Sequence, residues 1–352
     1  MLFPYFFLKI GYWSFMNKSE ICSVFRLMKR KKLLDKDAED IQFEIRKEYA
    51  RANVEKVFVQ SFGRIYGYRV SIEDEICFFP AKNAFSAQSS SARKLRDSFY
   101  EAGLIVPPFF NAHYLSQQGE KLSACEDKEF MASKVLAELY TPENVAKFFT
   151  ERWSILPPFN KYIGAIKQSI GCYYAGLLYA AVMTIIPCIE GVIREIGLVK
   201  GGDEGEVGGR NLIKVVETIC KDIRDRIFKE YTWFPEHVIT IDFLENENEN
   251  EQIQMLKNFK LFFERQLYEH TDRIESDILL NRHSILHGLS FDSINESSYL
   301  RLLNMLNSLY FIAILSGFRG PSFFPAHSEQ SISFLVDIQR AISNNEMRNF
   351  QN

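Results

Sequence analysis

The stretch YYAGLLYAAVMTIIPCIEGVIREIG, residues 173–197, decides the fold of the second half of this chain. Its first part, from Tyr173 to Ile189, is apolar over nearly the length that an α-helix needs to cross a membrane. It contains Gly176 and Pro187, however, and it runs directly into charged residues that begin at Glu190. We therefore predict the central helix of a soluble helical bundle rather than a membrane span.

Further apolar segments with helical spacing follow this stretch, and polar loops separate them. The change in character begins at ILPPFN, residues 155–160, where we place a domain boundary. Residues 160–345 are therefore predicted to form one antiparallel helical bundle. Its helices are expected at approximately 165–197, 211–231, 252–287 and 293–316.

Residues 1–155 are predicted to form a separate, mostly helical module, so the fold class of the whole chain is mainly α. A helical pattern runs through DAEDIQFEIRKEYARANVEKVFVQ, residues 37–60. From Phe62 to Phe79, β-branched and aromatic residues become frequent, which predicts a short strand pair. The apolar start of the chain lacks the basic residues and cleavage site of a signal peptide. A packed N-terminal element or a misassigned start is therefore favoured over export.

Composition limits the classes of function. The 352 residues carry a formal net charge of -3, so a site for a polyanion must be local. The six cysteines are far apart and form no CxxC pair, which favours a reducing, cytoplasmic compartment. The basic run MKRKK, residues 28–32, is interpreted as one solvated face, with phosphate contact as the alternative.

A second informative stretch is NRHSILHG, residues 281–288, near the end of an expected helix. Gly288 can supply the left-handed residue that ends many helices. Ser293 and Glu296 then have capping-box spacing for the following helix. The arginine and the two histidines of this stretch therefore lie at a helix end.

These three side chains can support the cleavage of RNA. A histidine can take the proton of a ribose 2′-hydroxyl or give one to the leaving 5′-oxygen, and an arginine can hold the scissile phosphate. That reaction needs no metal and leaves a 2′,3′-cyclic phosphate. His283 and His287 share one helical face, whereas Arg282 and His287 diverge by about 140° on a regular helix. Arg282 and His287 can converge only where the backbone is irregular or where a second protomer completes the site.

Residues 282–288 resemble the R-x4-6-H signature of the HEPN superfamily, whose all-α members include many metal-independent ribonucleases of prokaryotic toxin–antitoxin, abortive-infection and CRISPR systems. Residues 180–197 look like the first long helix of bacterial members, and residues 296–315 look like the closing helix. The resemblance covers roughly residues 165–345. It implies a HEPN-like bundle, a homodimer whose sites form where two motif helices face each other, and a polar role for His283.

Glu190 and Arg194 lie four positions apart on the apolar helix. They form an ion pair, or Glu190 orients Arg282 or a histidine. No cofactor is expected, and no metal, because a zinc site at 283 and 287 would lack a third ligand. The predicted site residues are Arg282, His287 and His283 as catalytic groups, with Glu190 and Asn281 in support.

Other interpretations of the motif stay open. Arg265 and His270, in ERQLYEH, have the same spacing and are interpreted as a chance match, because they lie within an expected helix and no glycine follows. Residues 282–287 can also form a plain helix end, with histidines that cap carbonyls and an arginine that pairs with an acid.

The leading hypothesis is a cytoplasmic endoribonuclease, not associated with a membrane, that acts as a toxin or antiviral-defence effector. Its expected partners are an RNA substrate, a second copy of the chain, and an antitoxin, a sensor or another defence-system subunit. The N-terminal module would bind such a partner or sense a trigger. The alternative is a catalytically inactive HEPN-like scaffold that mediates dimerisation or binds RNA, nucleotide or a partner. A third possibility is a helical interaction protein unrelated to the family.

Overall fold

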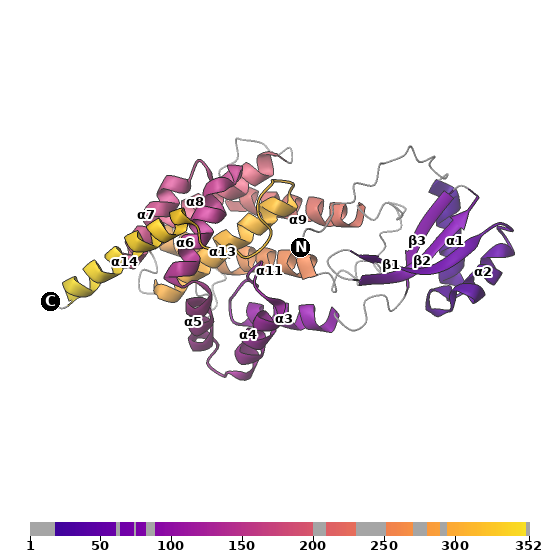
Figure 1. Ribbon diagram of the computed structural model, residues 1–352, viewed down its shortest axis with the longest axis horizontal. Helices are drawn as coiled ribbons and strands as arrows, with labels where there is room; N and C mark the ends of the chain where they lie inside the picture. Colours follow the sequence, from indigo (N-terminus) through magenta and orange to yellow (C-terminus); the bar gives the residue numbers. More distant parts are fainter. Residues whose placement is uncertain are drawn as a thin grey trace. The chain divides into compact units, whose positions relative to one another are not determined.

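The computed structural model describes residues 18–60, 64–73, 75–81, 89–199, 209–229, 251–269, 280–288 and 294–349. It confirms the mainly helical fold class, because these residues form helices and one small sheet (Figure 1). The chain divides into two compact units. One comprises Met1–Ser89 with Arg226–Asn250, and the other comprises Ser90–Asp225 with Glu251–Asn352.

The larger unit carries the candidate site and is built from helices. Helix α3 begins at the boundary between the units, and α9 runs past it. The elements are α3 (Ser89–Glu101), α4 (Ala112–Ala124), α5 (Lys128–Leu139), α6 (Pro142–Glu151), η2 (Trp153–Ile155), η3 (Pro157–Phe159), α7 (Ile163–Tyr174), α8 (Leu178–Leu198), α9 (Gly209–Lys229), α11 (Glu251–Phe262), η6 (Phe263–Leu267), α12 (Arg282–Leu286), α13 (Glu296–Leu315) and α14 (Glu329–Asn349).

The division between the units differs from the boundary that the sequence predicted. It falls at Ser89, whereas the sequence placed one module at 1–155 and the bundle at 160–345. Residues 90–155 belong to the helical unit, because α5 contacts α13 and α6 contacts α14. These contacts join segments far apart in the sequence, so a local change in composition does not reveal them.

Helix α13 is the most completely buried helix among the described residues. Arg301, which is 2% exposed, donates from Nη2 to Glu129 on α5 over 2.6 Å and from Nε to the carbonyl of Gly103 over 3.0 Å. Asn304 donates to the carbonyl of Ile105 over 2.7 Å. The expected central helix, α8, packs against α13 and α7, but it is less completely enclosed.

Helix α13 is also the one described helix that is long and apolar enough to cross a membrane by length and composition alone. Within its most apolar window, 89% of the residues are buried inside the fold. The core helix of a soluble protein has the same two properties, so this finding is weak support for a membrane span.

The single helix expected at 165–197 is two helices, α7 and α8. The N–H of Leu177 donates to the carbonyl of Cys172 over 2.8 Å, and Gly176, with φ of 76°, occupies the left-handed position between them. This is a Schellman ending. A Cβ on Gly176 would also lie 2.4 Å from Oδ1 of Asn345 on α14, so the glycine lets α14 approach the turn. The expectation of one continuous helix was therefore wrong at residues 175–177.

The helix expected at 252–287 ends much earlier. Helix α11 continues through the π-helical segment η6 to Leu267. Residues 270–279 lie outside the described residues, and α12 is a short helix of its own. It ends as predicted, because Gly288 has a φ of 73°.

The start of α13 also differs from the prediction. Asn295 is the N-cap, and its Oδ1 accepts from the N–H of Ser298 over 2.9 Å while the Ser298 hydroxyl accepts from the N–H of Asn295 over 3.3 Å. This reciprocal pair does the work expected of Ser293 and Glu296. Ser293 itself lies outside the described residues.

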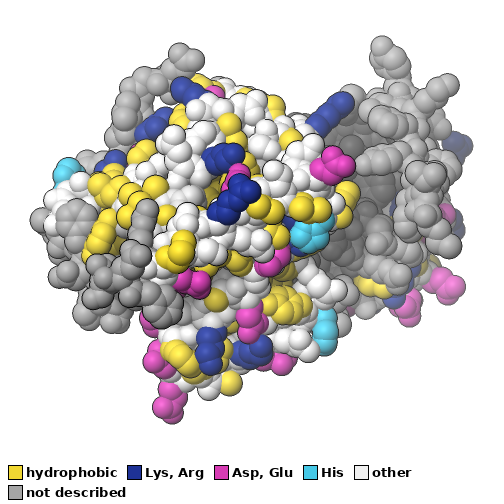
Figure 2. Space-filling model, turned by 60° about the vertical axis from the view of Figure 1, so that its left-hand side comes forward, with side chains coloured by type: hydrophobic (Ala, Val, Ile, Leu, Met, Phe, Trp, Pro, Cys, Tyr) yellow, Lys and Arg dark blue, Asp and Glu magenta, His cyan; other side chains and the backbone are white. Residues whose placement is uncertain are grey.

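Basic, acidic and hydrophobic side chains are intermingled on the described part of the face that Figure 2 shows. Lys and Arg side chains lie among Asp, Glu and hydrophobic side chains, and they form no continuous basic surface on the described part of this face. This mixture of charges is in keeping with the formal net charge of -3.

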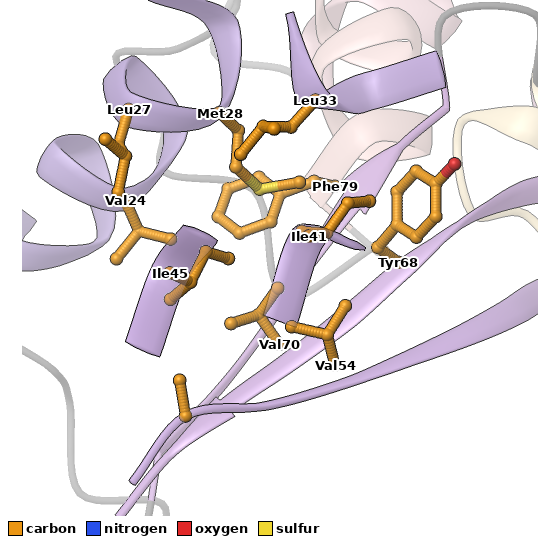
Figure 3. Packing of buried hydrophobic residues seen from close by; sticks show 11 residues of the cluster. Val24, Leu27, Met28, Leu33, Ile41, Ile45, Val54, Tyr68, Val70 and Phe79 are labelled. Carbon is orange, nitrogen blue, oxygen red and sulfur yellow. The ribbon is translucent and has the colours of Figure 1, made fainter. Parts of the chain in front are cut away.

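The smaller unit packs helices against one face of an antiparallel sheet (Figure 3). In the sheet, of strand order β1-β2-β3, Val54 lies opposite Val70 and Tyr68 lies opposite Phe79. Met28 and Ile41 from the helices complete the core. The elements are α1 (Lys18–Arg30), η1 (Leu33–Asp35), α2 (Ala38–Arg46), β1 (Asn53–Gln60), β2 (Arg64–Ile72) and β3 (Glu75–Pro80).

The helical pattern expected through residues 37–60 therefore holds only as far as Arg46. Residues 53–60 form β1 and pair with β2, so the expected strand pair is part of a three-stranded sheet. The β-branched residues of NVEKVFVQ suit a strand that buries one face. The charged residues between them gave the segment its helical appearance.

The α7–α8 turn provides a test of the fold. Gly176→Ala should destabilise the helical unit by roughly 1–2 kcal/mol, because a residue with a Cβ is strained at positive φ. Gly171→Ala is the control, since a Cβ there meets nothing within 4 Å and the position lies inside α7. It should raise stability by about 0.5–1 kcal/mol. Urea unfolding followed by circular dichroism measures both, and shifts of the same sign would contradict the turn.

Candidate functional site

The carboxylate of Glu190 is the centre of the candidate site. Glu190 lies on α8 and is 5% exposed. Its Oε1 accepts from Nε of Arg282 over 2.7 Å and from the hydroxyl of Tyr268. Its Oε2 lies 3.4 Å from Nη2 of Arg194, one turn further along α8. One buried carboxylate thus connects α8 with the residue after η6 and with the first residue of α12.

Both arrangements that the sequence left open for Glu190 are present. It pairs with Arg194 on its own helix, and it also contacts Arg282 of the motif. The shorter contact is the one to Arg282, which places the guanidinium against α8. A buried carboxylate needs such partners, because an unpaired charge inside a protein is very costly.

The cluster contains one positive charge in excess. Arg282 and Arg194 are both positively charged, and Glu190 supplies one negative charge between them. The side chain of Arg282 is 28% exposed, and no described residue accepts a hydrogen bond from its Nη groups. Nε of Arg194 is buried and has no hydrogen-bond partner among the described residues. This local positive charge, reachable from solvent through Arg282, suits an anion.

Tyr268 completes the cluster and had no signal in the sequence. Its hydroxyl donates to Glu190, and its ring centroid lies 5.9 Å from the guanidinium carbon of Arg282. Burial and the neighbouring carboxylate of Glu190 raise the pKa of the Tyr268 hydroxyl, so this group stays protonated and remains a donor. Arg194 was visible as an i, i+4 partner of Glu190, whereas no pattern pointed to Tyr268.

Asn281 fixes the start of the motif helix. It is 5% exposed, and its Oδ1 accepts from the N–H of Ser284 over 2.9 Å, which caps α12. Its Nδ2 donates to the carbonyl of Glu269 over 2.8 Å. Asn281 therefore ties α12 to the segment that carries Tyr268, and its contacts are those of a supporting residue.

His283 and His287 lie on another side of the motif. Both are exposed, and their ring centroids are 4.3 Å apart with an interplanar angle of 57°. They share one face as their spacing predicted. Within the described part of the chain, no hydrogen bond or ion pair joins either imidazole to Arg282. The described contacts of one copy therefore do not join the arginine to the histidines.

Two further sequence observations concern the same region. Arg265, half of the pair interpreted as a chance match, lies exposed in η6, and His270 lies outside the described residues. No group of three or more His, Cys, Asp or Glu side chains that could hold a metal ion occurs among the described residues.

A pocket of about 470 Å³ lies elsewhere, between α5, α6, α7 and the start of α13, and none of the predicted site residues lines it.

No family model matches this chain, and no curated protein or solved structure was found to be similar to it.

The ion pairs of Glu190 provide a second prediction. Glu190→Gln leaves two guanidinium groups without their carboxylate, and we expect a loss of about 2–3 kcal/mol in the free energy of unfolding. This loss is smaller than the loss expected when a fully buried ion pair is broken, because both arginines are partly exposed. Glu195→Gln, on the same helix, removes only a solvated contact of 3.5 Å to Lys161 and should cost no more than about 0.5 kcal/mol. Equal losses in urea unfolding would contradict the assigned role of Glu190.

Proposed function

We propose that this chain is a cytoplasmic, metal-independent endoribonuclease that acts as a toxin or antiviral-defence effector. The observation that carries the proposal is the placement of Arg282. Its Nε is held by the buried Glu190, and its Nη groups face no described acceptor. One exposed histidine lies on the same short helix and a second caps the end of that helix. The resemblance of residues 282–288 to the HEPN motif supports the same reaction.

Each side chain has a separate role in the proposed reaction. His287 takes the proton of the ribose 2′-hydroxyl, the 2′-oxygen forms a bond to phosphorus, and the bond from phosphorus to the 5′-oxygen breaks. The same imidazole passes the proton to the leaving 5′-oxygen. Arg282 stabilises the charge that develops on the phosphate oxygens. His283, one turn from His287, positions the phosphate.

We further propose that two copies of the chain build each site. In support of this, Nε of Arg282 bonds to Glu190, His283 and His287 are exposed, and no described hydrogen bond or ion pair joins the arginine to either imidazole. A two-fold dimer that pairs two α12 helices can place Arg282 of one copy opposite His287 of the other. The smaller unit, with its three-stranded sheet, is then available to bind an antitoxin, a sensor or another defence-system subunit.

One observation favours the scaffold as a second candidate function. Arg282 already forms an ion pair with Glu190 and packs on Tyr268, which is what a purely structural arginine does. On this alternative, the chain is a catalytically inactive HEPN-like protein that mediates dimerisation or binds RNA, nucleotide or a partner. The cluster of Glu190 then holds α12 against α8 and has no reacting group.

Activity measurements separate the two candidates. Arg282→Ala and His287→Ala should each lower the rate of RNA cleavage by at least about 10²-fold, because each removes either the charge or the proton carrier of the transition state. The Arg265→Ala variant replaces the exposed arginine of the second R-x4-H match and should cleave RNA as fast as the wild type. His283→Ala should retain part of the activity. Wild-type cleavage should survive EDTA and leave 2′,3′-cyclic phosphate ends, and full activity in His287→Ala would favour the scaffold.

Mixing two inactive variants tests the shared site. In a mixed dimer of Arg282→Ala and His287→Ala, one site carries both defects and the other is intact. After subunit exchange, an equal mixture should therefore recover roughly a quarter of the wild-type activity. A site built within one chain would stay inactive in the mixture. Analytical ultracentrifugation supplies the dimer content that this comparison needs, and an active monomer would contradict the shared site.

A further inference from the structure

His283 and His287 form a paired surface that can bind a ligand other than RNA. Both imidazoles are exposed, one turn apart, with ring centroids separated by 4.3 Å. Neither side chain forms a hydrogen bond or ion pair with a described residue. The nitrogen atoms of both rings are therefore available on the same side of α12.

Two histidines at positions i and i+4 are an arrangement by which helices present two imidazoles to one metal ion. A zinc ion binds imidazole nitrogen at about 2.0–2.1 Å, so two rings that share an ion lie close together and tilted to each other. The two rings here are already close and inclined by 57°. Joint binding of an ion then requires that side-chain rotation direct one nitrogen of each ring at a common point.

The backbone that carries the pair is held at its start and is helical through the pair. Asn281 caps the start of α12 and bonds to the carbonyl of Glu269, and Gly288 ends the helix with a φ of 73°. The N–H of His287 donates to the carbonyl of His283 over 3.0 Å, which sets the spacing of the two residues. Less conformational freedom is then lost when an ion binds.

The chemistry of the pair indicates the class of ion. Imidazole suits zinc, copper and nickel, whereas magnesium and calcium prefer oxygen ligands. Structural and catalytic zinc sites have three or four protein ligands. The described residues offer no third ligand here, so water would fill the other positions and the ion would exchange readily. Such a site suits reversible regulation better than a permanent metal.

We propose that His283 and His287 chelate one divalent transition-metal ion of the kind that imidazole suits, with water in its other positions, and that the bound ion inhibits cleavage. Coordination occupies the nitrogen lone pair that His287 needs to accept the proton of the 2′-hydroxyl. The inhibition rests on the function proposed above, whereas the ion site itself does not.

Calorimetry with nickel tests the ion site on the full chain after treatment with EDTA. The wild type should bind one ion that depends on both histidines, and His283→Ala and His287→Ala should each weaken binding by at least about tenfold. His113→Ala removes another exposed histidine, on α4, and should bind nickel like the wild type. Wild-type affinity in either motif variant would overturn the proposal.

A second measurement tests the inhibition. Zinc should inhibit RNA cleavage by the wild type, and EDTA should restore it. His283→Ala, which retains part of the activity, should need at least about tenfold more zinc for the same inhibition. If the chain binds nickel through both histidines but cuts no RNA, the ion site is supported and the ribonuclease is wrong. If an active chain is insensitive to zinc at saturation, the inhibitory role is wrong.

Discussion

The buried carboxylate of Glu190 is the interaction on which the rest of the candidate site depends. It lies on the apolar helix α8, where a charge without partners would be very costly. Its oxygens accept from Arg282, from Tyr268 and from Arg194, and the first two belong to segments outside α8. Satisfying this carboxylate therefore brings α12 against α8. The direction of the Arg282 guanidinium follows from that contact.

A second set of buried polar groups determines how far the helical unit extends. Arg301 and Asn304 on α13 bond to the carbonyls of Gly103 and Ile105, and Asn307 accepts from the buried Arg152 over 2.9 Å. Each bond satisfies a polar group in the core that would otherwise lose its hydrogen bonds to water. These bonds join α13 to residues 103–152, which lie far from it in the sequence. Residues 90–155 are thus part of the bundle and do not form a separate module.

The sequence predicted those features that depend on local chemistry. The mainly α fold, the bounds of α9 to within two residues and the helix end at Gly288 follow from apolar spacing and from the freedom of glycine. The turn at Gly176 was missed because the apolar pattern continues across it. Glycine is needed there for the left-handed φ and also for the close approach of Asn345, which only the tertiary fold reveals. Tyr268 was missed for the same kind of reason, since only the tertiary fold brings its hydroxyl to Glu190.

The excess positive charge of the cluster lies around a buried carboxylate, at two arginines that are partly exposed. Two guanidinium groups share one carboxylate, and Nε of Arg194 is buried without an acceptor among the described residues. Local departures of this kind are expected where stability has been exchanged for function. A phosphate held by the Nη groups of Arg282 would balance the charge and accept the hydrogen bonds that the described residues leave unmade. On the proposed function, the RNA backbone would supply this phosphate.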